Sequence, residues 1–215
     1  MKKRPPKADA FFHALSYSKI IFVEDKLEAA VREILKQLGE DPRREGLEKT
    51  PRRTAKVLRE ITCGYSADID KIFNGAFFRV NYKEMVMVRD ISFYSICEHH
   101  ILPFFGKVHL AYIPNGRIIG LSKIPRLVEA FSRRLQVQER LTTQIADTLQ
   151  NKLKPKGVGI VIEAQHLCMT MRGVKNAASR AVTSSMLGVF QTDNRVREEF
   201  LKLIKCPSIE KTPGL

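Results

Sequence analysis

The sequence predicts an α+β protein in which an antiparallel sheet carries helices on one face. Three observations support this class: two amphipathic helical segments come first, strand segments follow in consecutive pairs, and two further helical segments separate those pairs. Consecutive strands joined by hairpins favour antiparallel pairing, and the helices between the strand pairs segregate to one face. A chain of 215 residues is long enough for one domain with a sizeable core.

Two helices are expected in the N-terminal part of the chain. Over residues 25–39 apolar side chains recur at helical spacing, and Gly39 is a typical C-terminal stop. A second helix is expected where Thr50 can act as N-cap and Pro51 can occupy the first turn, and it runs to Gly64. The charged segment between them is predicted to be a loop.

The body of the protein is predicted to follow the order β-β-α-α-β-β. The expected strands cover residues 77–80, 85–94, 108–113, 117–119, 158–164 and 181–190, and the expected helices cover 122–135, 141–153 and 196–205. The turn Pro114, Asn115 and Gly116 is expected to join the strands on either side of it as a hairpin. Ser122 is placed to cap the helix that follows. His109 faces away from its two apolar neighbours, which predicts a structural or surface histidine.

These elements suggest four regions of the chain. They are an N-terminal arm over 1–22, a helical region over 23–75, a catalytic domain over 76–206 and a C-terminal tail over 207–215. A small open sheet has edges to protect, and assembly with other copies is one way to close them. An oligomer is therefore expected.

Composition limits the partners and the compartment. Lys and Arg number 37 against 23 Asp and Glu, and the net charge of +14 favours anionic partners. The basic residues form no single long run and no recognisable nucleic-acid motif, so nucleic acid is not the expected partner. No stretch approaches the roughly 18 apolar residues of a membrane span, and no cleavable leader is recognisable. The four cysteines show no paired spacing, so we expect a cytoplasmic protein that does not associate with membranes.

Two short clusters carry the chemistry. Cys97 and His100 form a C-x-x-H pair, and Cys168 can add a third ligand. A zinc ion held by three ligands of this type keeps its fourth position open for water. The bound water then becomes a nucleophile near neutral pH. His99 and His166 lie beside the ligands and are candidates to move protons. The ordinary alternative to a metal site is that the C-x-x-H spacing arises by chance and that the cysteines are buried free thiols. Three of the five histidines fall in these clusters, which favours the metal site.

Four segments carry a resemblance to a known family. They are CEHHILPFFG over 97–106, GLSKIPR over 120–126, QVQERLT over 136–142 and HLCMTMRG over 166–173. Their order and spacing resemble GTP cyclohydrolase I of the zinc-dependent type, over about residues 25–205. The resemblance implies a tunnelling fold in which the ββααββ units assemble into barrels and a toroidal homodecamer. It also implies conversion of GTP and water to formate and 7,8-dihydroneopterin triphosphate, the first step towards folate and other pteridines.

The resemblance also implies roles for the metal-site residues. It makes Cys97, His100 and Cys168 the zinc ligands, with zinc-bound water attacking C8 of the guanine ring. His166 would protonate the imidazole portion of the base. His99 would be the second acid/base group, assisting ring opening and the release of formate.

The substrate-binding residues are implied in the same way. Glu139, with Gln138 beside it, matches the family's guanine-binding pair; a carboxylate selects guanine because adenine would leave polar groups unpaired. Without the resemblance, Glu139 and Arg140 are equally consistent with a solvated charged face. Ser122 matches a residue near the ribose and the phosphates. The basic residues matched to the triphosphate are Lys123, Arg126, Arg172, Arg53 and Lys56. Because the family builds its site at subunit contacts, some of these should complete a neighbour's pocket.

One departure and three alternatives remain. The family often has threonine where this chain has Ala181, so any role of a hydroxyl there is in doubt. A nucleic-acid-binding protein with a structural zinc would need a fourth ligand and an extended basic surface. A nucleobase deaminase would need H-x-E followed by P-C-x-x-C, which the sequence lacks. A related tunnelling-fold protein that binds pterin without this activity is the third alternative, because fold does not determine function.

Overall fold

A computed structural model describes residues 25–172 and 178–206 of the chain. The described residues fall into two compact units, which divide between Val57 and Leu58. The expected arm over 1–22 and the expected tail over 207–215 lie outside the described residues.

The first unit contains α1 (Lys26–Gln37) and the beginning of α2 (Thr50–Ile61). Asp25 caps α1, because its carboxylate accepts a hydrogen bond of 3.0 Å from the main-chain N–H of Leu27. Gly39 follows α1 with φ of +84°, a conformation that glycine adopts without steric cost. Both predicted helices are confirmed.

The chain after α2 differs from the prediction, because α2 ends at Ile61 and a 3₁₀ helix, η1 (Cys63–Ser66), follows. Gly64 lies against α4 (Lys123–Ser132) instead of ending a helix. Its N–H donates to the carbonyl of Arg133 at 2.9 Å, and a Cβ at this position would lie 2.3 Å from a main-chain oxygen of α4. Glycine is thus needed here for close approach of two main chains.

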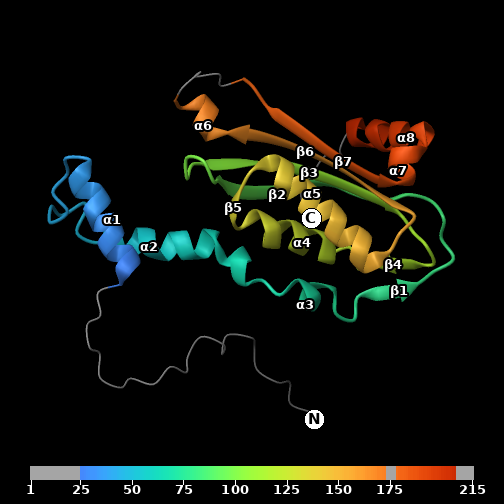
Figure 1. Cartoon of the computed structure of the whole chain (residues 1–215), viewed down its shortest axis with the longest axis horizontal. Coiled ribbons are helices and arrows are strands. Elements are labelled where there is room, and N and C mark those ends of the chain that lie inside the picture. Colours follow the sequence, from blue (N-terminus) through green and yellow to red (C-terminus); the bar gives the residue numbers. More distant parts are fainter. Residues whose placement is uncertain (1–24, 173–177, 207–215) are drawn as a thin grey trace, which may run out of the picture. The chain divides into compact units, whose positions relative to one another are not determined.

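The second unit is built on a five-stranded sheet with the strand order β5-β2-β3-β6-β7 (Figure 1). The strands are β2 (Val86–Cys97), β3 (Pro103–Ile113), β5 (Leu135–Gln136), β6 (Gly157–His166) and β7 (Ala181–Gly188). The four long strands are antiparallel, and the short β5 runs parallel to β2. With α4 and α5 (Gln138–Leu153) between β3 and β6, the chain follows the ββααββ order of the tunnelling fold, as predicted.

The main core lies between the sheet and the helices α4 and α5. Alternate residues of β3, Val108, Leu110 and Tyr112, face this core and are fully buried. Leu127 of α4 and Leu149 of α5 pack there without exposed surface. The apolar faces that the strand and helix periodicities predict therefore pack against each other in one layer.

The opposite face of the sheet carries α7 (Val189–Thr192) and α8 (Asn194–Lys205), so only α4 and α5 follow the prediction of helices on one face (Figure 1). Phe190 and Phe200 are fully buried in an edge-to-face pair with ring centroids 5.6 Å apart. A Cβ at Gly159 of β6 would lie 2.6 Å from the Phe190 ring, so this glycine makes room for the pair.

The predicted hairpin around residues 114–116 is wrong. β4 (Arg117–Ile119) pairs with β1 (Phe77–Arg79) in a separate two-stranded sheet. β3 pairs with β2 on one side and β6 on the other, so it has no free edge for β4. The main-chain N–H of Ile119 donates to the hydroxyl of Tyr112 at 3.3 Å, which anchors β4 near the end of β3.

Other differences concern where helices begin and end. α4 ends at Ser132, so Leu135 belongs to β5, and Gly188 with φ of +58° turns Phe190 into α7 instead of β7. Ser122 occupies the N-cap position of α4 but makes no side-chain capping hydrogen bond, because its main chain is already helical. The sequence reading did not predict α3 (Ile69–Phe73). Among the described residues, no helix combines the length and apolarity needed to cross a membrane.

His109 is a structural residue, as predicted. The β2–β3 pairing is interrupted between Val88 and Ile91, where Asp90 adopts φ of +59°. The N–H of Asp90 donates to His109 Nδ1 at 3.3 Å, and His109 is 5% exposed.

Candidate metal centre and substrate site

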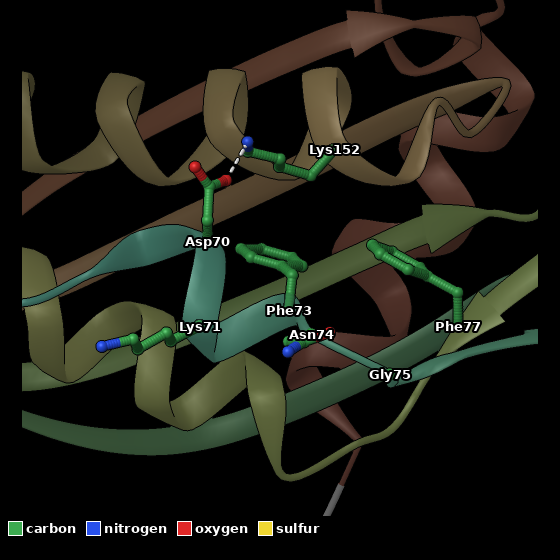
Figure 2. Close-up of a pocket in the computed structure, with 7 residues that line it drawn as sticks. All are labelled: Asp70, Lys71, Phe73, Asn74, Gly75, Phe77 and Lys152. Carbon is green, nitrogen blue, oxygen red and sulfur yellow. Dashed lines mark hydrogen bonds and ion pairs between the residues drawn. The ribbon is translucent and has the colours of Figure 1, made fainter.

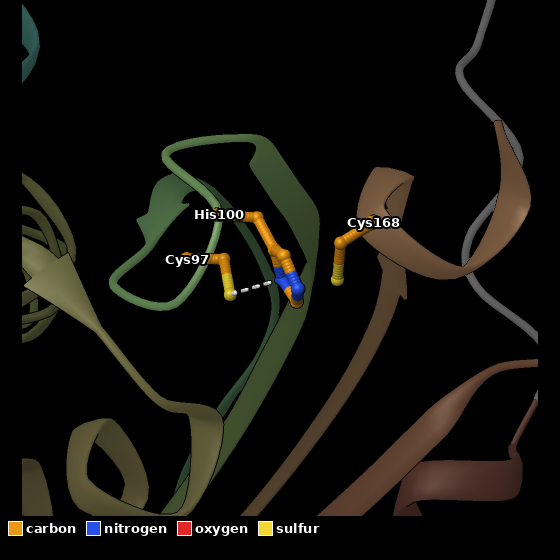
Figure 3. A group of neighbouring side chains, drawn as sticks. All are labelled: Cys97, His100 and Cys168. Atoms are coloured by element: carbon orange, nitrogen blue, oxygen red, sulfur yellow. Dashed lines mark hydrogen bonds between the residues drawn. The ribbon is translucent and has the colours of Figure 1, made fainter. Parts of the chain in front are cut away.

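Three side chains with metal-binding atoms converge in the second unit. Cys97 ends β2, His100 lies in the turn that follows, and Cys168 lies in α6 (Leu167–Thr170). Their ligand atoms all lie within 4.8 Å of one another, and Cys97 Sγ is 3.9 Å from His100 Nδ1 (Figure 3). Residues far apart in the sequence thus form one group.

Main-chain geometry brings these ligands together. The N–H of Ile101 donates to the carbonyl of Cys97 at 2.8 Å, and Ile101 adopts φ of +54°, which closes the turn tightly. The β3–β6 register pairs Phe104 with His166. The start of β3 and the end of β6 are therefore adjacent, which places Cys168 opposite the turn.

The three residues fit a zinc ion. Two thiolates and one imidazole are preferred zinc ligands, and tetrahedral bonds of about 2.3 Å to sulfur and 2.0 Å to nitrogen hold ligand atoms about 3.5–4 Å apart. The observed spacing requires only a small contraction. Burial, followed by the neighbouring Cys97 thiol, raises the pKa of Cys168. A cation between the two sulfurs removes this penalty on the thiolate forms.

His166 lies beside the metal group and is held on two sides. Its ring stacks on Phe104 with centroids 4.6 Å apart and planes 5° apart. Its Nε2 is 2.8 Å from Oε1 of Gln138. Burial lowers the pKa of His166, and the negative charge of Glu139 acts in the opposite direction. Gln138, predicted to bind guanine, is 2% exposed, whereas Glu139 is exposed.

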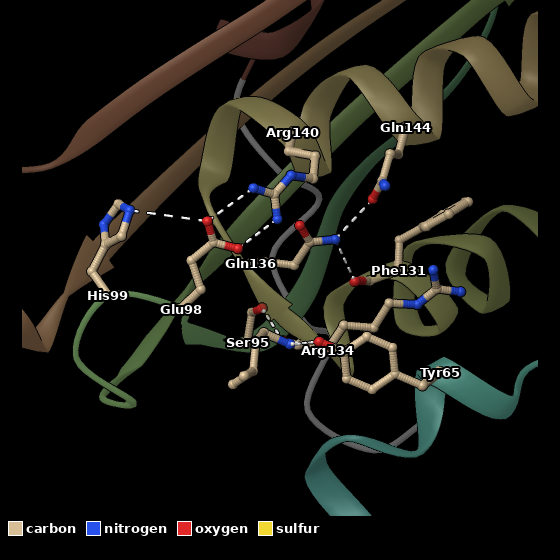
Figure 4. A network of polar contacts seen from close by, with 10 residues as sticks. Tyr65, Ser95, Glu98, His99, Phe131, Arg134, Gln136, Arg140 and Gln144 are labelled. Carbon is tan, nitrogen blue, oxygen red and sulfur yellow. Dashed lines mark hydrogen bonds and ion pairs between the residues drawn. The ribbon is translucent and has the colours of Figure 1, made fainter.

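A polar network joins the metal-binding turn to the start of α5 (Figure 4). Glu98 accepts hydrogen bonds from Arg140 at 2.5 and 2.9 Å, and its main-chain N–H donates to the carbonyl of Gln136 at 3.0 Å. The Arg140 hydrogen bond lowers the pKa of Glu98. His99 is exposed, with Nε2 4.0 Å from Glu98 Oε1. The sequence reading assigned no role to Glu98 and considered Arg140 only as solvated charge, although both lie within the matched segments.

The sequence profile of the GTP cyclohydrolase I family matches residues 27–205. The chain belongs to the GTP cyclohydrolase I family. Curated relatives named GTP cyclohydrolase 1 support the assignment. The protein of Leptospira biflexa is 59% identical over 182 residues, covering 85% of this chain and 100% of that protein. The protein of Chlorobium chlorochromatii is 59% identical over 84% of this chain and 81% of its own length, and that of Campylobacter jejuni is 54% identical over 85% and 96%.

The GTP cyclohydrolase I fold of this chain separates some predicted site residues from the metal group. Cys97 ends β2, a strand that spans roughly 35–40 Å. Tyr112, which pairs with the first residue of β2, anchors Ile119 shortly before α4 begins. The first turn of α4 with Ser122, Lys123 and Arg126 therefore lies toward the other end of the sheet (Figure 1).

The remaining predicted phosphate-binding residues divide between the units. Arg172 is exposed near the metal group, since its charge acts to lower the pKa of Cys168. Arg53 and Lys56 are exposed on the part of α2 that belongs to the first unit.

A surface pocket of about 480 Å³ lies elsewhere in the second unit (Figure 2). Phe73 and Phe77 line it with stacked rings 6.0 Å apart, and Lys152 bonds Asp70 across its rim. Its described lining includes none of the candidate metal ligands or predicted substrate-binding residues. The pocket is therefore separate from the family's candidate site.

Proposed function

We propose that this chain is a zinc-dependent GTP cyclohydrolase that converts GTP and water to formate and 7,8-dihydroneopterin triphosphate. The product would enter tetrahydrofolate or another pteridine pathway. The observation that carries the proposal is the convergence of Cys97, His100 and Cys168 on one point, in a chain 59% identical over most of its length to a protein named GTP cyclohydrolase 1. Three ligands leave a fourth tetrahedral position for water.

Two histidines supply proton transfer in the proposed site. Zinc, when bound by Cys97, His100 and Cys168, supplies Lewis acidity and lowers the pKa of water. His166 is held by Phe104 and Gln138 beside the ligands, a position suited to protonating the imidazole part of guanine. His99 is exposed on the same turn as His100 and is suited to assist ring opening and formate release.

Charge selects the substrate. The exposed Glu139 lies in the first turn of α5, close enough to His166 for its charge to act on that ring. It is proposed to accept hydrogen bonds from the N–H edge of guanine. Gln138 precedes it at the guanine end of the site. The triphosphate is assigned to Arg172, together with Lys123, Arg126, Arg53 and Lys56, and Ser122 is assigned to the ribose side. A net charge of +14 favours such an anion.

A second copy of the chain would complete the site. Within one chain, Ser122, Lys123 and Arg126 lie toward the end of the sheet opposite the metal group. A substrate-sized site can combine both sets only if a neighbouring subunit contributes one of them. This supports a homo-oligomer with shared sites, and we propose the family's homodecamer, in the cytoplasm, with residues 23–75 as the helical region and 76–206 as the catalytic domain.

The deciding experiment is incubation of the purified chain with GTP, with and without a zinc chelator. Formate and a pterin triphosphate are followed by chromatography. Both products should appear only with zinc, and readdition of zinc should restore them. Folded, zinc-loaded protein that releases neither product contradicts the proposal and leaves a tunnelling-fold protein that binds without turnover.

A further inference from the structure

The side-chain amide of Gln138 is buried, and both of its ends bond to neighbouring groups. Its Nε2 lies 3.0 Å from the carbonyl oxygen of Ile162, 3.1 Å from that of Ala181 and 3.1 Å from Oγ1 of Thr183. Its Oε1 lies 2.8 Å from His166 Nε2. With 2% of the residue exposed, neither end of the amide is available to another ligand.

The main-chain carbonyls determine which way the amide points. The oxygens of Ile162 and Ala181 can only accept hydrogen bonds, so the group facing them must be the NH₂ of Gln138. The reversed amide would place its oxygen against these two carbonyl oxygens, and none of the three oxygens could donate a hydrogen bond to another.

A circuit of hydroxyl groups supports the same orientation. Thr142 Oγ1 donates to the main-chain carbonyl of Gln138 at 2.7 Å, so its hydrogen is used. Thr183 Oγ1, 2.7 Å from Thr142 Oγ1, must then donate to Thr142. Because the Thr183 hydroxyl donates its hydrogen to Thr142, its oxygen can only accept a hydrogen bond from Gln138 Nε2. The hydroxyl that faces the Gln138 amide in this circuit belongs to Thr183, two residues after Ala181 on β7.

The orientation of Gln138 determines the tautomer of His166. The amide oxygen can only accept, so the ring nitrogen that faces it, Nε2, must carry hydrogen. In the neutral ring the other nitrogen, Nδ1, is then without a proton. Stacking on the fully buried Phe104 holds the ring plane, and the hydrogen bond holds its rotation within that plane.

We infer that Gln138 is a positioning residue that holds His166 as the Nε2-protonated tautomer, so that His166 exchanges its catalytic proton with the substrate through Nδ1. This inference rests on the proposed function, in which His166 is the acid. The two adjacent residues then have different roles. Glu139 contacts guanine, and the Gln138 side chain acts only through His166. A second-sphere amide of this kind directs proton transfer by geometry.

The tautomer can be measured without any substitution. Long-range ¹H–¹⁵N spectra of zinc-loaded protein labelled in histidine distinguish protonated from unprotonated ring nitrogens, and the signals absent from His166→Ala identify this residue. Above the pKa of His166, protonated Nε2 and unprotonated Nδ1 are expected. A protonated Nδ1 overturns the inference. This result does not depend on turnover, so it is separate from failure of the proposed reaction, which would appear as absence of formate from wild-type protein.

A double-mutant cycle tests the role in the reaction. Gln138→Met should lower kcat by about 10- to 100-fold with little change in KM for GTP, and should have no further effect in the His166→Ala background. GTP affinity should be equal in His166→Ala and in the double variant. A GTP affinity that falls with Gln138→Met in both backgrounds shows a direct guanine contact and overturns the inference.

The chain offers a matched control. Gln150 lies on the same helix, donates to the carbonyl of Pro155 at 3.2 Å and is partly buried. Gln150→Met therefore changes the same residue type on α5 without touching His166, and kcat should be unchanged. If Gln138→Met does not fold, Thr183→Val breaks the hydroxyl circuit while two carbonyls still hold the amide, and the Nε2-protonated tautomer should persist.

Discussion

Both oxygens of the Glu98 carboxylate accept hydrogen bonds from the Arg140 guanidinium. In the sequence, Glu98 stands between the candidate ligand Cys97 and the two histidines of the turn, and Arg140 lies in the first turn of α5 beside Glu139. One ion pair therefore connects the candidate metal site to the segment proposed to recognise guanine. Because the pair is partly exposed, it contributes little to the free energy of unfolding. Its effect is to hold the turn in position relative to α5.

Removing this connection should weaken zinc binding. Arg140→Ala frees Glu98 in the turn that carries Cys97 and His100. The looser turn should bind zinc up to about 10-fold more weakly, the lower end of the loss that follows removal of a group bonded directly to a ligand. Competition with a chromophoric chelator measures the change. Arg195→Ala is the control, since Arg195 of α8 makes a similar two-bond pair with Asp193, the N-cap residue of that helix. Equal zinc affinities for the two variants would show that the pair does not support the turn.

Cys168→Ser should lose zinc and activity together. A serine hydroxyl is a poor zinc ligand, and two remaining ligands hold the metal weakly. Metal content by atomic emission should fall from near one zinc per chain towards zero, with formate release falling in parallel. Cys63→Ser changes an exposed thiol outside the group and should keep both. Full activity in a zinc-free Cys168→Ser protein would exclude the ligand assignment.

His166→Ala should separate proton transfer from metal binding. Its ring is not a member of the ligand group, so zinc content and GTP affinity should be retained. Loss of a positioned acid typically costs about 10²- to 10⁴-fold in rate, which should appear in kcat for formate release. Unchanged turnover would remove His166 from the mechanism.

Stability should fall in mild acid because of His109. Burial lowers its pKa below the ordinary 6.5, against the opposing charges of Asp90 and Glu163, while Lys107 and Arg89 favour the lowering. The unfolded chain therefore takes up a proton as the pH falls below 6.5, which the folded chain resists. His109 thus contributes stability above that pH and loses it below, with a slope of at most about 1.4 kcal/mol per pH unit.

Urea unfolding at pH 7.5 and 5.5 tests this contribution. His109→Gln can still accept from the Asp90 N–H but cannot titrate, so its urea midpoint should fall less on acidification than that of the wild type. An identical fall in both proteins would assign the acid sensitivity to other groups.

Local sequence patterns were sufficient for most of the elements. Apolar spacing predicted α1 and α5, because a helix buries one face at a fixed period, and apolar, β-branched content predicted β6. The partner of β4 was not predictable in this way. A turn such as Asn115-Gly116 favours a hairpin, but the free edge it needs is taken by β6, a strand much later in the chain.

The sequence by itself determined the ββααββ order, the family and the identity of the three candidate ligands, since each is carried by residue types at short spacing. Only the tertiary structure decided that Gln138 faces His166 and is buried, and that Ser122, Lys123 and Arg126 lie far from the metal group within one chain. The physical reason is that hydrogen bonds and pockets depend on strand register and packing between distant segments. Those contacts have no local pattern in the sequence.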